Sequence, residues 1–118
     1  MKIAFTSSGD NLRAPLNPHF GRAPKFLIYD LENGDFEIID NRQNLNAVQG
    51  AGIQSAETVS ASKVGAVVTG HCGPKAFQAL NLAGIKVFHT DSETIAEAIE
   101  KYKSGALVEA TIEDSERH

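Results

Sequence analysis

The residues best suited to chemistry begin in the segment NPHFGRAPKF, residues 17–26. Its two prolines enclose an imidazole at His19 and a guanidinium at Arg22, with Phe20 and Gly21 between them. A guanidinium binds anions through a rigid set of N–H donors, and an imidazole ligates metals or exchanges protons near neutral pH. The segment therefore favours a loop that binds an anion or a metal-containing group.

A second candidate segment is GHCGP, which ends at Pro74. Cys72, the single cysteine of the chain, and Gly73 directly precede this proline, which suits the first position of a helix. The N–H groups at a helix N-terminus favour an anion and would lower the pKa of a thiol placed there. Gly70 and Gly73 would let a bulky ligand approach the backbone beside His71.

Hydrophobic periodicity predicts the elements that must position these two segments. Short apolar runs predict five strands, and apolar spacing of three to four residues predicts three helices. Asn33-Gly34 predicts a tight hairpin turn between the second and third strands. The strands are expected at residues 2–7, 25–31, 35–40, 64–70 and 85–90, and the helices at residues 48–63, 74–83 and 91–103.

Two details of these helices are specific enough to check. Ile53, Ala56 and Val59 recur at three-residue spacing and are expected on the buried face of the first helix. Thr90 and Glu93 have the spacing of a capping box and are expected to begin the last helix.

The predicted order β-β-β-α-β-α-β-α belongs to the α/β class. The hairpin makes the second strand antiparallel to its neighbours, and the later βαβ units give parallel pairs. We expect a mixed five-stranded sheet in the order 3-2-1-4-5, with helices on both faces.

Both candidate segments follow strands expected to be parallel neighbours, the first and the fourth. The carboxyl ends of these strands then share one edge, and edges where the chain departs in opposite directions bind ligands in open α/β sheets. His89 ends the fifth strand at the same edge. His19, Arg22, His71 and Cys72, with His89 as a further candidate, are therefore expected to point toward one place. Each segment alone also fits a structural role, with Phe20 or Cys72 buried in the core.

Length, composition and charge bound the possible functions. A chain of 118 residues fits one domain, and a single cysteine excludes an internal disulfide and favours a reducing, cytoplasmic setting. The formal net charge of −4 does not suit a general nucleic-acid binder, and no apolar run is long enough for a membrane span. Residues 1–25 carry four basic side chains against one acid, which favours a small anion as partner.

The C-terminal residues 106–118 differ in composition from the rest. They hold four acids and one arginine and have no clear apolar period. We expect residues 1–105 to form the domain, residues 106–118 to be an acidic, mobile tail, and the protein to be a monomer or a weak dimer.

Three segments and the strand order resemble the dinitrogenase iron–molybdenum cofactor biosynthesis family, which includes nitrogenase accessory proteins and orange-protein-like single domains. The segments are HFGRAPKF at residues 19–26, GHCGPKAF at residues 70–77 and LNLAGIKV at residues 80–87. The resemblance covers about residues 1–105. It implies a ribonuclease H-like three-layer fold and the binding or transfer of an anionic metal–sulfur cluster.

The resemblance also implies a cargo and a partner. The cargo would be a molybdenum–copper sulfide cluster or an iron–molybdenum cofactor precursor, and the partner a cluster-accepting or ATPase-type protein. The family pattern includes the first loop and the glycines of the second, but it does not require Cys72. With the side chains found above, the candidate cofactor-binding residues are His19, Phe20, Gly21, Arg22, Gly70, His71, Cys72 and Gly73. Among them, the candidate metal ligands are His19, His71 and Cys72.

The resulting prediction is a non-catalytic carrier of a metal–sulfur cluster, and two alternatives stay open. Cys72 could be the nucleophile of a sulfur-transfer enzyme with His71 or His19 as its base. A small phosphate- or nucleotide-binding module is the other alternative, because a helix N-terminus also suits phosphate. A nuclease is excluded because the predicted central strands lack the clustered carboxylates of two-metal chemistry.

Overall fold

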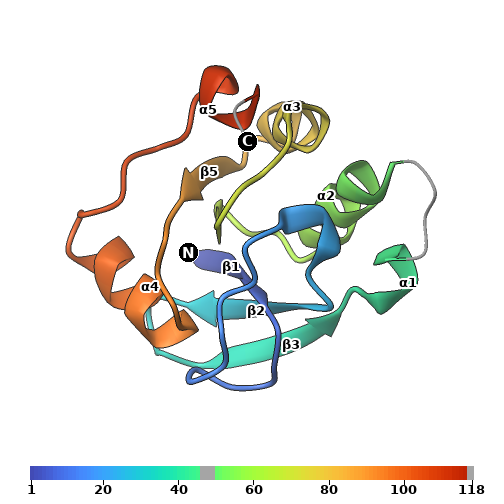
Figure 1. The fold of residues 1–118 in the computed structure, drawn as a ribbon. Helices are drawn as coiled ribbons and strands as arrows, with labels where there is room; N and C mark the ends of the chain where they lie inside the picture. Colours follow the sequence, from blue (N-terminus) through green and yellow to red (C-terminus); the bar gives the residue numbers. More distant parts are fainter. Residues whose placement is uncertain (46–49, 117–118) are drawn as a thin grey trace.

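The chain folds around one central sheet, which a computed structural model describes for residues 1–45 and 50–116 (Figure 1). The strands in these ranges are β1 (Lys2–Ser7), β2 (Lys25–Asp30), β3 (Phe36–Asp40), β4 (Ala66–Thr69) and β5 (Lys86–His89). The helices are η1, a single 3-10 turn (Phe20–Arg22), α1 (Arg42–Leu45), α2 (Ala51–Ala61), α3 (Pro74–Leu82), α4 (Ile95–Lys103) and α5 (Ile112–Glu116). None of the helices in the described ranges could cross a membrane, because none is long and apolar enough.

The strand order is β3-β2-β1-β4-β5, as the sequence predicts. β2 is antiparallel to both β1 and β3, whereas β1–β4 and β4–β5 are parallel pairs. The carboxyl ends of β1, β4 and β5 therefore lie at one edge of the sheet. The predicted α/β class and the mixed sheet are confirmed.

The sheet is covered on both faces, because its central strands bury alternate residues in two different clusters. Ile3 and Phe5 of β1 pack with Ile95 of α4 in one cluster. Ala4, which points to the other face, belongs to a second cluster with Phe77 of α3. Helix α4 thus covers one face, and α2 and α3 cover the other (Figure 1).

The buried face of α2 differs from the prediction. The expected helix start at Val48 lies outside the described residues. Ala56 and Val59 are buried as expected, but Ile53 is 38% exposed, so its predicted core position is wrong. The helix turns Ser55 inward instead, where its hydroxyl accepts a hydrogen bond from a buried asparagine.

The predicted cap of α4 is also wrong. Thr94, not Thr90, is the N-cap residue, and its hydroxyl accepts a hydrogen bond from the N–H of Glu97 at 3.2 Å. The Thr90 hydroxyl instead lies 2.8 Å from that of Ser92 in the preceding turn. Both threonines have a glutamate three residues later, so the spacing alone did not distinguish them. Glu97 also forms an ion pair with Lys101, four residues later on the same helix, at 3.3 Å.

The described part of the predicted tail, residues 106–116, lies against the domain. Glu109 pairs with Phe88 at the outer edge of β5, and the N–H of Ala110 donates to the carbonyl of Val87 at 2.7 Å. Helix α5 follows and packs on α3 (Figure 1). The sequence did not predict this packing, because the few apolar residues of the segment have no regular spacing: Leu107 packs against one core cluster and Ala110 belongs to the other. The boundary at residue 105 and the mobility of the tail stay predictions.

Candidate functional site

The first half of the long loop after β1 holds the N-terminus of α4. The carbonyl of Ala14 accepts from the N–H of Ile95 at 3.0 Å, and the carbonyl of Leu12 accepts from Ala96 at 2.8 Å. These bonds satisfy N–H groups of the first helical turn that a helix cannot satisfy itself. The loop is therefore fixed to the scaffold, and the N–H groups of Ile95 and Ala96 at the start of α4 are hydrogen-bonded within the fold.

The second half of the loop packs on α2 through the turn η1. Phe20 is 1% exposed, and its ring centroid lies 5.4 Å from that of Phe26. Gly21 lies against α2 so closely that an added Cβ would be 3.2 Å from the Cα of Gly52. The structural alternative for Phe20 is confirmed, and this packing fixes the positions of the residues on either side of it.

The two candidate segments meet at the carboxyl edge of β1 and β4. His19 and His71 pair as neighbouring strand residues, and the N–H of Phe20 donates to the carbonyl of His71 at 3.0 Å. A Cβ added to Gly70 would lie 2.6 Å from the Cα and the carbonyl oxygen of Pro18. Gly70 therefore lets the two loops touch each other, and its expected role of admitting a ligand stays a prediction. An added Cβ on Gly73 would meet nothing within 4 Å.

Cys72 does not have the environment of a reactive thiol. Its side chain is 0% exposed and belongs to the core cluster on the α3 face, with its Sγ 3.7 Å from the carbonyl oxygen of Gly73. Burial raises the pKa of the thiol to about 12, because the apolar surroundings disfavour the thiolate. The predicted lowering of this pKa by the helix N-terminus is wrong. The alternative role of Cys72, a small side chain buried in the core, describes it correctly.

His71 and His89 form a pair beside the meeting point of the loops. Their ring centroids are 5.2 Å apart, and Nε2 of His89 accepts a hydrogen bond from the N–H of Cys72 at 3.0 Å. Burial lowers the pKa of His89, and the neighbouring His71 lowers it further. A neutral ring that accepts through Nε2 carries its proton on Nδ1. His89 therefore positions the second loop, while His19 is exposed at the surface of the first.

Two helix N-termini flank the same place. A Cβ added to Gly52, in the first turn of α2, would lie 3.1 Å from the Cβ of Ala76 in the first turn of α3. The N-cap residue of α3 is Gly73, which has no side chain to accept hydrogen bonds from the first N–H groups of the helix. Arg22, at the end of η1, is exposed, and its Nη1 donates to the carbonyl of Leu45 at 3.2 Å. Helix dipoles and a guanidinium thus give this side of the meeting point of the loops positive character.

We name these residues the rim: His19 and Arg22 from the first loop, His71 and Gly73 from the second, and the first turns of α2 and α3. Sequence reasoning missed the contribution of α2. Gly52 is the signal that could have found it, because a glycine in the first turn of a helix permits close approach of another backbone.

A hollow of about 560 Å³ lies next to the rim, beyond His89. Lys101 of α4 and the C-terminal segment form its outer wall, which the sequence did not predict. Its lining residues are Gly70, His89, Thr90, Asp91, Lys101, Ala106, Leu107 and Val108. Within residues 1–45 and 50–116, no three His, Cys, Asp or Glu side chains are grouped to hold a metal ion.

The fold and the rim define a class of protein: a small α/β domain in which two loops meet at the carboxyl ends of its parallel strands. The family follows from a direct match. A sequence model of the dinitrogenase iron–molybdenum cofactor family matches residues 1–105, and the chain belongs to this family.

Individual relatives agree with this assignment. An uncharacterized protein of Methanocaldococcus jannaschii is 38% identical over 110 residues, which cover 91% of this chain and 89% of the relative. The apo form of the orange protein from Desulfovibrio gigas is 37% identical with a TM-score of 0.91, and the match covers 93% of this chain and 92% of that one. A Thermotoga protein of the DUF35 family is 30% identical with a TM-score of 0.81, covering 92% and 91% of the two chains.

Proposed function

We propose that this protein binds an anionic metal–sulfur cluster at the rim and carries it during the assembly or transfer of a molybdenum- or iron-containing cofactor. The family is named for the iron–molybdenum cofactor of dinitrogenase, and the chain has the fold of the orange protein along nearly its whole length. In this proposal the protein is a carrier without catalytic activity, and a cluster-accepting or ATPase-type protein receives the cargo.

The observation that carries the proposal is the contact between the two loops. Pairing of His19 with His71 joins the loop that carries the exposed imidazole and Arg22 to the loop that leads into α3 at Gly73. A metal–sulfide cluster is a bulky, soft anion. Guanidinium and amide N–H groups can balance its charge, and imidazoles can ligate the metal or donate to the sulfides.

The candidate ligand Cys72 is not among the metal ligands of this proposal. A thiolate would have to form where burial raises the pKa to about 12, and the side chain would have to leave the core. The proposed ligands are therefore His19 and His71, with Phe20, Gly21 and Gly70 shaping the loops that hold them. The same environment disfavours the sulfur-transfer alternative, which needs an accessible thiolate at Cys72.

Anaerobic reconstitution tests the proposal directly. The protein is incubated with tetrathiomolybdate and copper(I), or with iron and sulfide with and without molybdate, and then separated from free reagent by gel filtration. We expect a visible absorption band that elutes with the protein. Arg22→Ala should weaken retention of the chromophore by about tenfold or more, because a charge-assisted hydrogen bond is lost.

Arg13→Ala is the matched control, because Arg13 is an exposed arginine in the same loop and lies away from the rim. It should retain the chromophore like the unmodified protein. Failure of every combination to yield a protein-bound chromophore would refute cluster binding. If no chromophore forms but inorganic phosphate binds at the rim, the phosphate-binding alternative is favoured instead.

A further inference from the structure

The two outer edges of the sheet differ in how the chain covers them. The β5 edge is covered by residues 109–110. β3 forms the opposite edge and pairs on one side with β2. On that side the carbonyl of Asp35 and the N–H of Asn41 form hydrogen bonds, and antiparallel pairing alternates from residue to residue. The backbone groups of Phe36, Ile38 and Asp40 therefore point outward.

Within the described ranges, the backbone groups of these three residues form no hydrogen bond across the outer edge. An exposed row of N–H and C=O groups is a template for an additional strand. The edge thus offers main-chain hydrogen bonds to any extended segment whose side chains suit its two faces.

The chain around this edge is strongly acidic. Residues 30–40 contain five acidic and no basic side chains, namely Asp30, Glu32, Asp35, Glu37 and Asp40. Asp40 forms an ion pair with Arg42, and Glu32 lies 3.7 Å from the N-terminal amine. In the described part of the chain, the carboxylates of Asp30, Asp35 and Glu37 form no ion pair. These charges select a basic partner.

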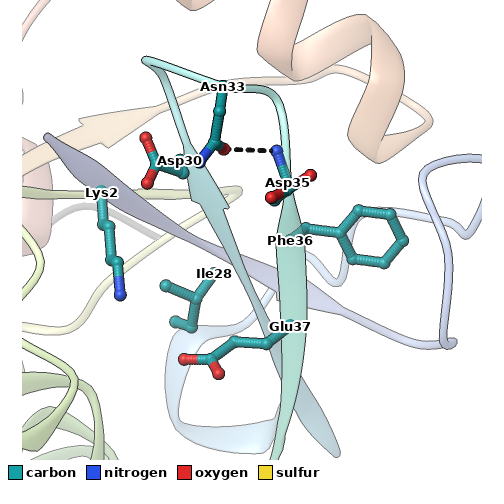
Figure 2. Close-up of a pocket in the computed structure, with 7 residues that line it drawn as sticks. All are labelled: Lys2, Ile28, Asp30, Asn33, Asp35, Phe36 and Glu37. Atoms are coloured by element: carbon teal, nitrogen blue, oxygen red, sulfur yellow. Dashed lines mark hydrogen bonds between the residues drawn. The ribbon is translucent and has the colours of Figure 1, made fainter.

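The edge strand presents a different surface on each face, as Figure 2 shows. Glu37 points to the face that carries Lys2 and Ile28, where a hollow of about 240 Å³ opens, and Phe36 points to the opposite side of the strand. Phe36 is 40% exposed and borders a second depression that includes Leu12. On the first face three carboxylates outnumber the single amine of Lys2, so that face suits basic side chains. On the second face Phe36 and Leu12 offer an apolar surface beside Asn11 and Arg13.

We propose that the β3 edge is a docking site for a basic, extended segment of a partner protein, which adds to the sheet as a sixth strand. Alternate basic side chains of the segment would face Glu37 and Asp30, and the apolar side chains between them would cover Phe36. Main-chain pairing supplies affinity, and the alternation of side chains supplies specificity.

The acidic side chains around the β3 edge disfavour two other occupants of this edge. A second copy of this chain would bring its own acidic β3 against this one, and like charges on neighbouring strands are destabilising. A nucleic acid is repelled by the same carboxylates. Phe36 and Glu37 pair with the end of β2 at the amino-terminal edge of β1, opposite the rim. The docked partner would therefore leave the rim open, and the inference does not depend on the cargo proposed above.

The test uses the full chain labelled with nitrogen-15 and a synthetic octapeptide of alternating lysine and valine with blocked ends. We expect peptide-induced amide shifts confined to residues 28–40 and the adjoining β1 start, and weaker binding as salt is raised. The double variant Asp35→Lys/Glu37→Lys should bind about tenfold more weakly, because favourable surface charge pairs become repulsive. The control Glu113→Lys/Glu116→Lys changes two exposed acids on α5 by the same charge and should bind normally.

Two further peptides keep the proposal falsifiable if a variant fails to fold. A glutamate–valine octapeptide should not bind, and a lysine–valine octapeptide with methylated backbone nitrogens should lose at least about tenfold in affinity, because it cannot complete the strand pairing. Equal binding of the methylated peptide would overturn the strand addition. Shifts that map to the rim or to α5, no binding by the lysine–valine peptide, or a stable dimer through β3 would also overturn the proposal.

Discussion

Gly70→Ala tests the contact between the two loops. The added Cβ would lie 2.6 Å from both the Cα and the carbonyl oxygen of Pro18, and both atoms belong to backbone that cannot rotate away. Overpacking of this kind costs about 1–3 kcal/mol. The loss of a glycine from the unfolded chain offsets about 0.4–1 kcal/mol of that cost. We expect a net loss of about 1–2 kcal/mol in the free energy of unfolding.

Thermal unfolding followed by circular dichroism measures this loss. For 118 residues the unfolding entropy is about 0.25 kcal/mol per kelvin, so the midpoint should fall by about 4–8 °C. Gly73→Ala is the matched control three residues later, because its added Cβ meets nothing within 4 Å and its φ is −68°. Its stability should change by less than about 1 kcal/mol.

Hydrogen exchange at one amide separates loop contact from general destabilisation. The N–H of Phe20, which donates to His71, should exchange faster in Gly70→Ala than the overall loss of stability accounts for. A Gly70→Ala protein as stable as the unmodified one would refute the described contact. An equal loss in Gly73→Ala would show that any side chain is harmful in this loop, and that the contact with Pro18 is not the cause.

Three further predictions concern single side chains. The Cys72 thiol should react with a disulfide reagent at pH 8 at least about a thousandfold more slowly in the folded protein than in urea, because its pKa is raised from 9.0 to about 12; similar rates in both states would contradict its burial. Thr94→Ala should cost about 1 kcal/mol in urea unfolding, whereas Thr90→Ala should cost less, and the reverse order would restore the predicted cap. Asn41→Ala should cost about 2–3 kcal/mol, because Asn41 is 0% exposed and its amide donates to Ser55 and to a loop carbonyl; a loss below about 0.5 kcal/mol would contradict that role.

Local patterns predicted the fold well where one physical signal dominates. The buried strands β1 and β4 each contain three consecutive apolar residues, and right-handed βαβ crossovers restrict their arrangement to few topologies. Where two positions match the same local pattern, the sequence did not show which of them the structure uses. Thr90 and Thr94 both satisfy the capping pattern, and the carbonyls that the β1 loop supplies to α4 favour the helix start at Thr94.

The candidate site divides in the same way. His19 and His71 were brought together correctly, because strand direction alone places both loops at one edge. The state of Cys72 could not be predicted from its place before a helix, since desolvation by the packed core outweighs the helix dipole there. The contact of Gly70 could not be predicted for a related reason, because the backbone that Gly70 admits belongs to the distant residue Pro18.

By itself, the sequence determined the order of the five strands and of the helices α2, α3 and α4, but not the short helices η1, α1 and α5. It also determined the sharing of one edge by the two loops and the acidic character of residues 30–40. These properties follow from periodicity, connectivity and charge, which are local or additive along the chain. Tertiary structure decided the burial of Cys72, the packing of residues 106–116 on β5 and the exposure of the β3 edge. Burial and edge exposure depend on which distant segments occupy the neighbouring space, and that is known only when the whole chain has packed.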